Sequence, residues 1–209
     1  GCGTRMGQLT AQQPKCMTKL SPCETILSRQ LRQLSQAGIQ EVVMTTGPFA
    51  EMLEEYCQAL ALPLRYTFVY NKDYPSTNYI YSIFLAQEHL NEELLLLHGD
   101  LVMEDAVVFQ AVESRRSCMV ISSTAPLPDK DFKARLCEGR IAAVGIDFFD
   151  SAVAAQPLYH LLPEDWKIWK ARIDAFCKAG TVSCYAEEAF NQESDRCTVY
   201  PLDIRNLLC

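Results

Sequence analysis

The spacing of apolar and polar positions near the start of the chain predicts a helix. Leu27, Leu31 and Leu34 recur at helical spacing, and Gly38 follows them as a residue that commonly ends a helix. The preceding segment, Ser21-Pro22-Cys23-Glu24, has the residue types of a capping box with proline at the first helical position. We therefore expect a helix from this box to Gly38.

Strands and helices are predicted to alternate over the next part of the chain. Strands are expected at 41–45, 65–70, 93–98 and 117–122, and helices at about 49–60, 80–90 and 104–114. The run 93–98 contains consecutive leucines, which suits a strand buried on both faces at the centre of a sheet. This order predicts an α/β fold with a three-layer, mostly parallel, Rossmann-like sheet and helices on both faces.

After residue 122 the alternation is less regular. Apolar segments on both sides of Glu138-Gly139-Arg140 predict a β-hairpin, which we interpret as a small lobe inserted over a cleft. Pro163 begins a helix whose first turn carries acidic residues and whose apolar stripe is expected in the core. We expect one domain over 1–209, with a first part at about 1–122 and the lobe at about 123–192.

Composition narrows the possible partners. The 209 residues carry a net charge of −7 and are 49% hydrophobic, which is typical of a globular domain. Because the chain has no dense cluster of lysine and arginine, neither nucleic acid nor an anionic membrane is expected as the main partner. The ten cysteines form no CxxC pair, and no signal peptide is visible, so we expect a reducing, cytoplasmic setting. The sequence leaves open whether the chain forms a homodimer.

The first fifteen residues have the chemistry of a polyphosphate-binding loop. Gly1 and Gly3 allow close approach of the backbone to an anion, and Arg5 and Lys15 can neutralise it. The pattern is neither a P-loop nor a dinucleotide fingerprint, because Met6 stands where the latter needs a third glycine. The alternative is a mobile terminus with two solvated cations.

Asp100 is the candidate metal ligand. It directly follows the leucine-rich strand, and ligands of such sheets bind beyond the carboxyl ends of the strands. The alternative is that Asp100 caps the helix beginning near Glu104. Taken alone, the capping role would be favoured, but together with the polyphosphate-binding loop Asp100 is predicted to be a metal ligand. Mg²⁺ bound to a nucleoside triphosphate takes one or two carboxylates and keeps several waters, so one aspartate can contribute much of the protein's part of the site.

Four stretches in this order resemble the nucleotidyltransferase superfamily, and most closely the bacterial CTP:phosphocholine and aminoalkylphosphonate cytidylyltransferases. They are 1–6 with Pro14-Lys15, 70–87, His98-Gly99-Asp100 and Tyr185-x-Glu187. The resemblance implies transfer of CMP from CTP to an aminoalkyl phosphate or phosphonate, such as phosphocholine or 2-aminoethylphosphonate, with release of pyrophosphate and with Mg²⁺ as cofactor.

The resemblance also assigns roles at matching positions. Arg5, Lys15 and Asp100 would act at the triphosphate, and the nucleotide-binding set would be Gly1, Gly3, Thr4, Arg5, Thr46, Gly47, Asn78 and Ser82. Asn78 could equally serve as a helix N-cap. Because the attacking oxygen of the acceptor is already anionic, no general base is needed, and His98 is given a packing or hydrogen-bonding role.

An acceptor with an ammonium group favours aromatic faces and a carboxylate. The candidates are Phe132, Lys133, Tyr185 and Glu187, with Asp147 and Tyr159 behind them and Lys130 beside Lys133. The alternatives are a loop anchor for Phe132, a core position for Tyr185 and solvated charges for the lysines. Where the phosphocholine enzymes tend to carry tryptophan, this chain has Phe132 and Ala186, which favours a primary amine over choline.

Two other functions stay open. A sugar-1-phosphate nucleotidyltransferase would use polar rather than aromatic contacts in the lobe. The resembled family also has a strand before the glycine loop and a second metal-binding aspartate after the final strand, and neither is in the given sequence. We therefore expect a fragment, and a non-catalytic nucleotide-binding domain is the third hypothesis.

Overall fold

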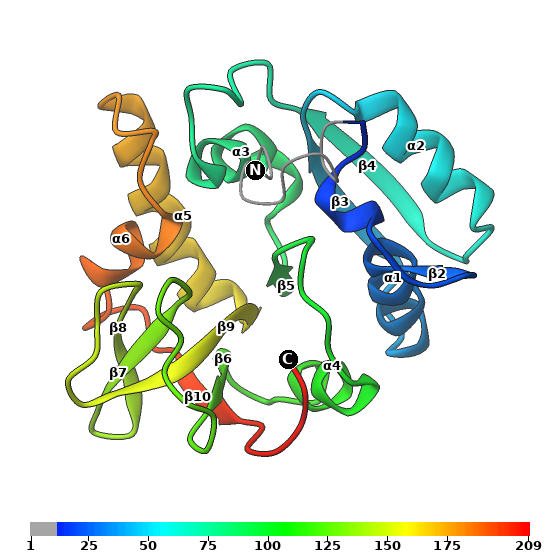
Figure 1. Cartoon of the computed structure of the whole chain (residues 1–209). Coiled ribbons are helices and arrows are strands. Elements are labelled where there is room, and N and C mark those ends of the chain that lie inside the picture. The colour runs from blue at the N-terminus through cyan, green and yellow to red at the C-terminus, as the bar shows by residue number, and fades with distance from the viewer. Residues whose placement is uncertain (1–11) are drawn as a thin grey trace.

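The structure is a computed structural model that describes residues 12–209. The leucine run forms strand β5 (Leu94–Leu97), which lies between the N-terminal and C-terminal parts of the ribbon (Figure 1). The helices are α1 (Ile26–Gln36), α2 (Ala50–Ala59), α3 (Tyr79–Ala86), α4 (Asp105–Val112), α5 (Pro163–Lys178) and α6 (Ala186–Asn191), with short 3₁₀ turns η2 (Lys15–Met17) and η3 (Gln87–His89). The other strands are β1 (Lys19–Ser21), β2 (Glu24–Thr25), β3 (Glu41–Thr46), β4 (Arg65–Tyr70), β6 (Cys118–Ser122), β7 (Lys133–Cys137), β8 (Arg140–Gly145), β9 (Ala152–Leu161) and β10 (Tyr200–Asp203).

The strands form a large mixed sheet and two small ones. The large sheet has the order β10-β6-β9-β7-β8, with β5 also paired to β9, while β3 pairs with β4 and β1 with β2. The pairs β10–β6 and β3–β4 are parallel, and the pairings of β9 are all antiparallel. The α/β class predicted from the sequence is confirmed, and the pairing is more mixed than the alternation alone indicated.

Strand β9 is the longest strand, and the sequence analysis did not predict it. Its ten residues include Pro157, which lacks a backbone donor and is disfavoured in a regular ladder. The register between β6 and β9 shifts at this point, because two steps from Met119 to Ile121 match four steps from Tyr159 to Ala155. The proline therefore lies in an irregularity of the sheet, where it is tolerated.

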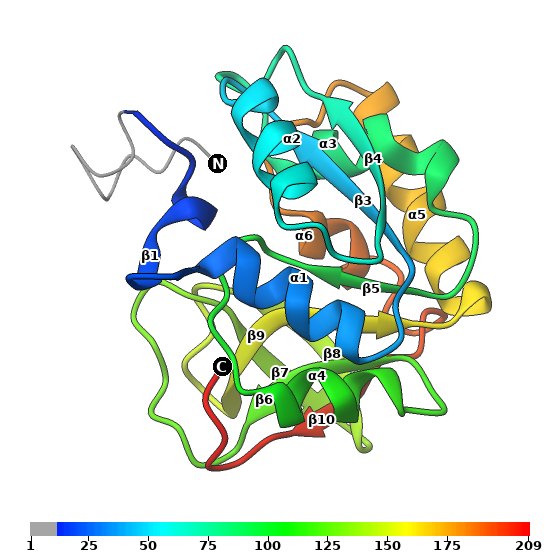
Figure 2. The same cartoon turned by 90° about the vertical axis from the view of Figure 1, so that its right-hand side faces the viewer.

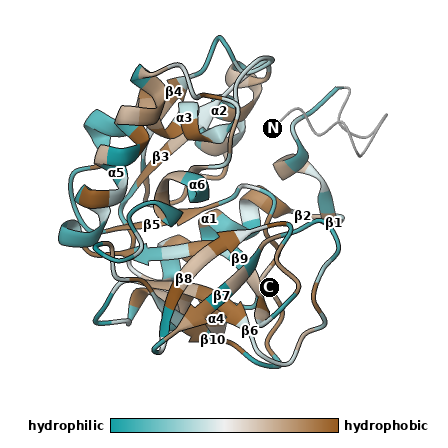
Figure 3. Ribbon diagram, turned by 90° about the vertical axis from the view of Figure 1, so that its left-hand side faces the viewer, coloured by the Kyte–Doolittle hydropathy of each residue, from teal (hydrophilic) through white to brown (hydrophobic). Residues whose placement is uncertain are grey.

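Side chains of β5 alternate between two hydrophobic clusters. Leu94 and Leu96 pack in the cluster that contains residues of α3, α5 and α6, whereas Leu95 and Leu97 pack in the cluster of α1 and α4. Figure 1 shows α1 and α4 to the right of β5 and α5 and α6 to its left, and in the turned view of Figure 2 α1 and α4 face the viewer. In Figure 3 the strands of the large sheet are mostly in hydrophobic colours, while α5 changes along its length. Helices thus cover both faces, as predicted.

Helix α1 begins later than the sequence indicated. Its N-cap is Thr25, whose hydroxyl accepts from the backbone of Ser28 while the Ser28 hydroxyl accepts from the backbone of Thr25. The predicted start at Ser21-Pro22-Cys23-Glu24 is wrong because these residues belong to the β1–β2 ribbon. Gly38 follows the helix with a φ of 88°, so the predicted end is confirmed.

The predicted hairpin is present as β7 and β8. Glu138 and Gly139 have φ values of 49° and 75°, as a two-residue hairpin turn of the primed type requires. Strand β7 also pairs with β9, so the hairpin extends the large sheet.

The buried stripe of α5 is also as predicted. Pro163 stands at the start of the helix, and Trp166, Trp169 and Ile173 are buried. Among residues 12–209, none of the helices combines the length and apolarity that crossing a bilayer requires.

Candidate active site

The structure brings Lys15 and Asp100 into contact, although 85 positions separate them in the chain. The Lys15 ammonium donates to Asp100 Oδ2 at 2.5 Å. Lys15 lies in η2, and Asp100 lies in the turn that follows β5. The side chains are 41% and 37% exposed, so a ligand can reach both. Asp100 does not cap α4, because the N-cap position is Glu104.

Burial alone would raise the pKa of Asp100, but the hydrogen bond and charge of Lys15 outweigh it and hold this pKa below its usual range. Asp100 is therefore ionised at neutral pH. Within residues 12–209 no group of three or more His, Cys, Asp or Glu side chains could hold a metal on its own. A single accessible carboxylate still fits Mg²⁺, which can take its other oxygen ligands from phosphate and water.

Four of the sequence-predicted residues, Gly1, Gly3, Thr4 and Arg5, lie outside the described residues. Their assignment to the triphosphate stays a prediction.

Thr46 and Gly47 stand where β3 ends. Thr46 is 5% exposed, and its hydroxyl has no hydrogen-bond partner among the described residues. A Cβ at Gly47 would lie 3.4 Å from the ring of Tyr74, so the loop after β4 packs closely against this turn. The turn after β3 and the loop after β4 are therefore in contact.

Asn71, at the end of β4, organises the neighbouring loop. It is 2% exposed, and its amide nitrogen donates to the hydroxyls of Thr77 and Ser82, each at 3.1 Å. The side-chain oxygen Oδ1 of Asn71 accepts from the backbone N–H of Asp73 at 2.9 Å. Ser82, predicted to contact the nucleotide, is therefore held in place by Asn71.

Asn78 has the alternative role that the sequence analysis considered. Its side-chain oxygen accepts from the backbone N–H of Tyr79 at 2.7 Å, so it is the N-cap of α3. This cap fixes the first turn of α3, which begins at Tyr79.

Four rings from four parts of the chain form a cluster, which we call the four-ring cluster: Tyr79, His98, Phe132 and Tyr185. The centroids of Tyr79 and His98 are 4.6 Å apart, and those of His98 and Phe132 are 6.1 Å apart. Tyr185 lies 5.2 Å from Phe132 and 6.2 Å from Tyr79. Since His98 is two residues from Asp100, the cluster begins directly beside the Lys15–Asp100 pair.

Glu187 lies at the cluster's Tyr79 side. It is 1% exposed and accepts hydrogen bonds from the hydroxyls of Tyr79 and of Tyr159, the latter at 2.8 Å. Burial raises the pKa of Glu187 to about 8. Burial also raises the pKa of Tyr159 well above its usual value, so this phenol stays a neutral donor.

The raised pKa of Glu187 predicts how stability depends on pH. From about pH 5 to pH 8 this carboxyl is ionised in the unfolded chain but stays mostly protonated in the folded chain. The free energy of unfolding should therefore fall as pH rises through this range and level off above it. We expect a fall of a few kcal/mol, moderated by the two tyrosine donors. Urea unfolding at pH 5, 6.5 and 8.5 should show this fall in the unmodified protein and in Glu188→Gln, whose side chain is exposed. It should be reduced in Glu187→Gln, and an equal fall in all three would contradict the assignment.

Lys133 does not point into this site. Its side chain is fully buried, and its ammonium donates to the carbonyl oxygens of Asp129, Asp131 and Ile146. It also lies 4.2 Å from the ring centroid of Phe149. We therefore correct the predicted role: Lys133 ties two loops together next to Phe132, and it is not available to an acceptor. Lys130 and Asp147 are exposed.

The sequence analysis missed Tyr79 and placed little weight on His98. The available signal was their position: Tyr79 follows the N-cap of α3, and His98 follows β5. Both sites are strand-to-loop or loop-to-helix junctions, where ligand-binding residues of α/β sheets are found.

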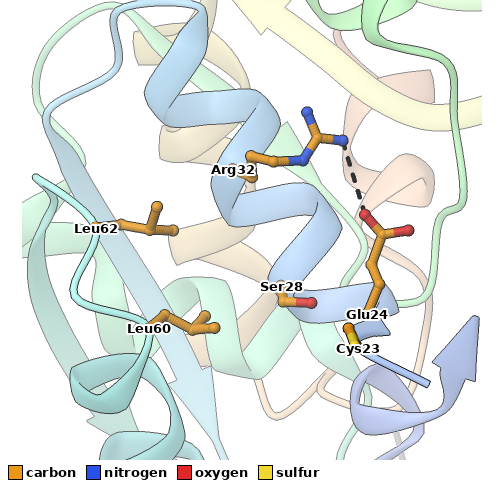
Figure 4. Close-up of a pocket in the computed structure, with 6 residues that line it drawn as sticks. All are labelled: Cys23, Glu24, Ser28, Arg32, Leu60 and Leu62. Carbon is orange, nitrogen blue, oxygen red and sulfur yellow. Dashed lines mark ion pairs between the residues drawn. The ribbon is translucent and has the colours of Figure 1, made fainter. Parts of the chain in front are cut away.

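A surface cavity of about 210 Å³ lies elsewhere, between the start of α1 and the loop after α2 (Figure 4). Its lining contains none of the residues placed above, and its charged groups are already paired: Arg32 with Glu24 and Asp105, and Glu24 with Arg29.

Comparison with solved structures gives close similarity over the whole chain. The inositol-1-phosphate CTP transferase from T. maritima matches with a TM-score of 0.81 and 20% identity, over 100% of this chain and 84% of that chain. The CTP:phosphocholine cytidylyltransferase from Streptococcus pneumoniae matches with a TM-score of 0.80 and 17% identity, over 100% and 88%. At these identities the similarity defines the fold, which is that of an α/β nucleotidyltransferase.

Sequence comparison places the chain more narrowly. It belongs to the MobA-like NTP transferase domain family, whose model matches residues 1–137. It is 32% identical over 123 residues to CMP-5'-(3-aminopropyl)phosphonate synthase from Streptomyces rubellomurinus, covering 59% of this chain and 19% of that protein. It is 24% identical over 127 residues to CTP:phosphoglutamine cytidylyltransferase from Campylobacter jejuni, covering 58% and 49%. The chain is thus cytidylyltransferase-like, and it spans half or less of these relatives' length.

Proposed function

We propose that this domain transfers CMP from CTP to a small acceptor that carries a phosphate or phosphonate at one end and a primary amine at the other, with release of pyrophosphate. The observation that carries the proposal is the four-ring cluster, which begins beside Asp100 and has the buried carboxyl of Glu187 behind it. An ammonium group is attracted by aromatic faces and by a carboxylate. The acceptor's phosphorus end would then lie toward Asp100 and Lys15.

The surroundings of Glu187 favour a primary amine over choline. A primary ammonium can donate N–H bonds to the carboxylate, whereas a quaternary ammonium has no donor. The name of the Streptomyces relative, a CMP-aminopropylphosphonate synthase, supports an aminoalkylphosphonate such as 2-aminoethylphosphonate. A quaternary acceptor would also need more aromatic surface than Phe132 and Tyr185 offer.

The chain's own residues would act mainly by alignment and by neutralising charge. The acceptor oxygen attacks the α-phosphorus of CTP and pyrophosphate leaves, and since this oxygen is anionic at neutral pH no general base is required. Lys15 and Arg5 would neutralise the triphosphate, and Gly1 and Gly3 would let the backbone approach it closely. Thr46, Gly47, Asn78 and Ser82 would border the nucleoside. Asp100 would hold Mg²⁺, which stabilises the charge that develops on the phosphates.

Replacing Lys15 by methionine is expected to weaken CTP binding by tenfold or more. The reason is the loss of a charge-assisted contact, which contributes about 1.5–3 kcal/mol. Calorimetric titration of CTP with Mg²⁺ measures the effect. Lys19→Met, an exposed lysine on β1, is the matched control and should bind CTP normally. Equal affinity in Lys15→Met and the control would remove Lys15 from the triphosphate site.

The proposed reaction is tested with the full-length native protein. CTP or UTP, Mg²⁺ and one acceptor are mixed, and pyrophosphate release is measured with 2-aminoethylphosphonate, phosphocholine or glucose 1-phosphate. We expect the highest kcat/KM with CTP and 2-aminoethylphosphonate. Release only with the sugar phosphate would replace the proposal by a sugar-1-phosphate nucleotidyltransferase. CTP binding without turnover of any acceptor would favour a non-catalytic nucleotide-binding domain.

A further inference from the structure

The backbone of His98 is held in place from two sides. Its N–H donates to the carbonyl of Pro157 at 3.1 Å, and its carbonyl accepts from the side-chain amide of Gln30 at 3.0 Å. Gln30 is 3% exposed and also donates to the carbonyl of Leu101, so α1 fixes the whole turn after β5. The imidazole is therefore attached to a backbone that is held in place between Asp100 and the other three rings of the four-ring cluster.

The side chain of His98 is less well satisfied than its backbone. Its ring lies edge-on to Tyr79 and to Phe132, with interplanar angles of 74° and 67°. Its Nε2 is enclosed, yet it has no hydrogen-bond partner among the described residues. An enclosed polar atom without a partner lowers stability, and such an atom in a cluster of rings indicates a place for a ligand's polar group.

We propose that His98 donates a hydrogen bond from Nε2 to a phosphate or phosphonate oxygen of the acceptor and so orients the acceptor for attack. This inference rests on the proposed function. If the ammonium lies against Glu187 and the reacting phosphorus lies near Asp100, the acceptor must pass the imidazole, which is the nitrogen-bearing ring of the four-ring cluster. The hydrogen bond goes to an oxygen that does not attack, and His98 takes no proton in the reaction.

The amide of glutamine can offer an N–H near the position of the imidazole Nε2, whereas phenylalanine keeps a ring without a nitrogen. We therefore compare His98→Phe with His98→Gln, and use His89→Phe, on the partly exposed η3 turn, as the matched control. In His98→Phe the KM for 2-aminoethylphosphonate should rise tenfold or more while the KM for CTP is unchanged. His98→Gln should recover most of the affinity, and His89→Phe should behave as the unmodified protein.

Ethylamine, which has the ammonium but no phosphonate, separates the two ends of the acceptor. As a competitive inhibitor against 2-aminoethylphosphonate it should bind equally well to His98→Phe and to the unmodified protein. If His98→Phe lost affinity for ethylamine and for 2-aminoethylphosphonate to the same extent, His98 would only pack against the aromatic rings. An unchanged KM for 2-aminoethylphosphonate in His98→Phe would overturn the inference directly. In both cases the unmodified protein stays active, whereas absence of turnover in that protein would refute the proposed function and this inference together.

Discussion

Replacing Asp100 by alanine is expected to lower kcat for pyrophosphate release from CTP by about a thousandfold. The Asp100 side chain is accessible, and among the described residues the only other side chain that bonds to it is that of Lys15. Its loss should therefore remove charge stabilisation at the triphosphate without opening a cavity in the core. The free energy of unfolding should change by less than about 1 kcal/mol, since the lost ion pair is exposed.

Asp195→Asn is the control for this variant, because Asp195 is an exposed aspartate outside the site. Both variants are compared by urea unfolding and by pyrophosphate release at saturating Mg²⁺. Turnover by Asp100→Ala within a few fold of the control would refute the assignment of Asp100 to the metal and the triphosphate. Unfolding of Asp100→Ala at low urea would instead assign it a structural role.

Replacing Glu187 by glutamine is expected to raise the KM for 2-aminoethylphosphonate by about a hundredfold, because a buried charge pair with the ammonium can no longer form. The shape of the side chain is kept: the single amide oxygen of glutamine can accept from one of the two hydroxyls, of Tyr79 and Tyr159, and its NH2 group can donate to the oxygen of the other. The KM for CTP should not change, since the proposed nucleotide position is at the other end of the site.

The same residue predicts a pH dependence of acceptor binding. With a pKa of about 8 in the free protein, Glu187 must lose its proton before it can pair with an ammonium, so acceptor affinity should rise by close to tenfold per pH unit from pH 6 toward 8. Glu188→Gln, an exposed neighbour, should keep this slope, whereas Glu187→Gln should lose the part of it that ionisation of Glu187 causes. The phosphonate also titrates in this range, and the slope that persists in Glu187→Gln measures that contribution. Identical slopes in the two variants would rule out Glu187 as the acceptor's partner.

Much of the α/β framework could be predicted from periodicity. The strand at 65–70 and the apolar stripe of α5 follow from local patterns, and the leucine run indicated a strand with two covered faces. Strand β9 could not be predicted in the same way, because Pro157 interrupts the local pattern and only pairing with β5, β6 and β7 makes the segment a strand. Tertiary pairing also displaced the start of α1, where a short ribbon replaced the expected capping box.

The candidate site was predicted in part. The sequence indicated Lys15, Asp100, Phe132, Tyr185 and Glu187, and the structure brings Lys15 to Asp100 and the two rings together. The sequence could not show where a side chain points. Lys133 looks like a solvated cation beside Phe132, but its ammonium points inward and donates to three carbonyl oxygens.

Tyr79 shows the converse. It looks like one more apolar residue of α3, but its hydroxyl reaches Glu187 across 108 positions of the chain. Contacts of this range depend on the fold and not on local pattern.

The central claim is that the Lys15–Asp100 pair and the Glu187 side of the four-ring cluster are two ends of one site. A crystal structure with a non-hydrolysable CTP analogue, Mg²⁺ and 2-aminoethylphosphonate tests it most directly. The account predicts the acceptor's amine within hydrogen-bonding distance of Glu187, its phosphonate beside His98, and the triphosphate at Lys15 and Asp100. An acceptor bound away from Glu187, or a triphosphate bound away from Asp100, would contradict it.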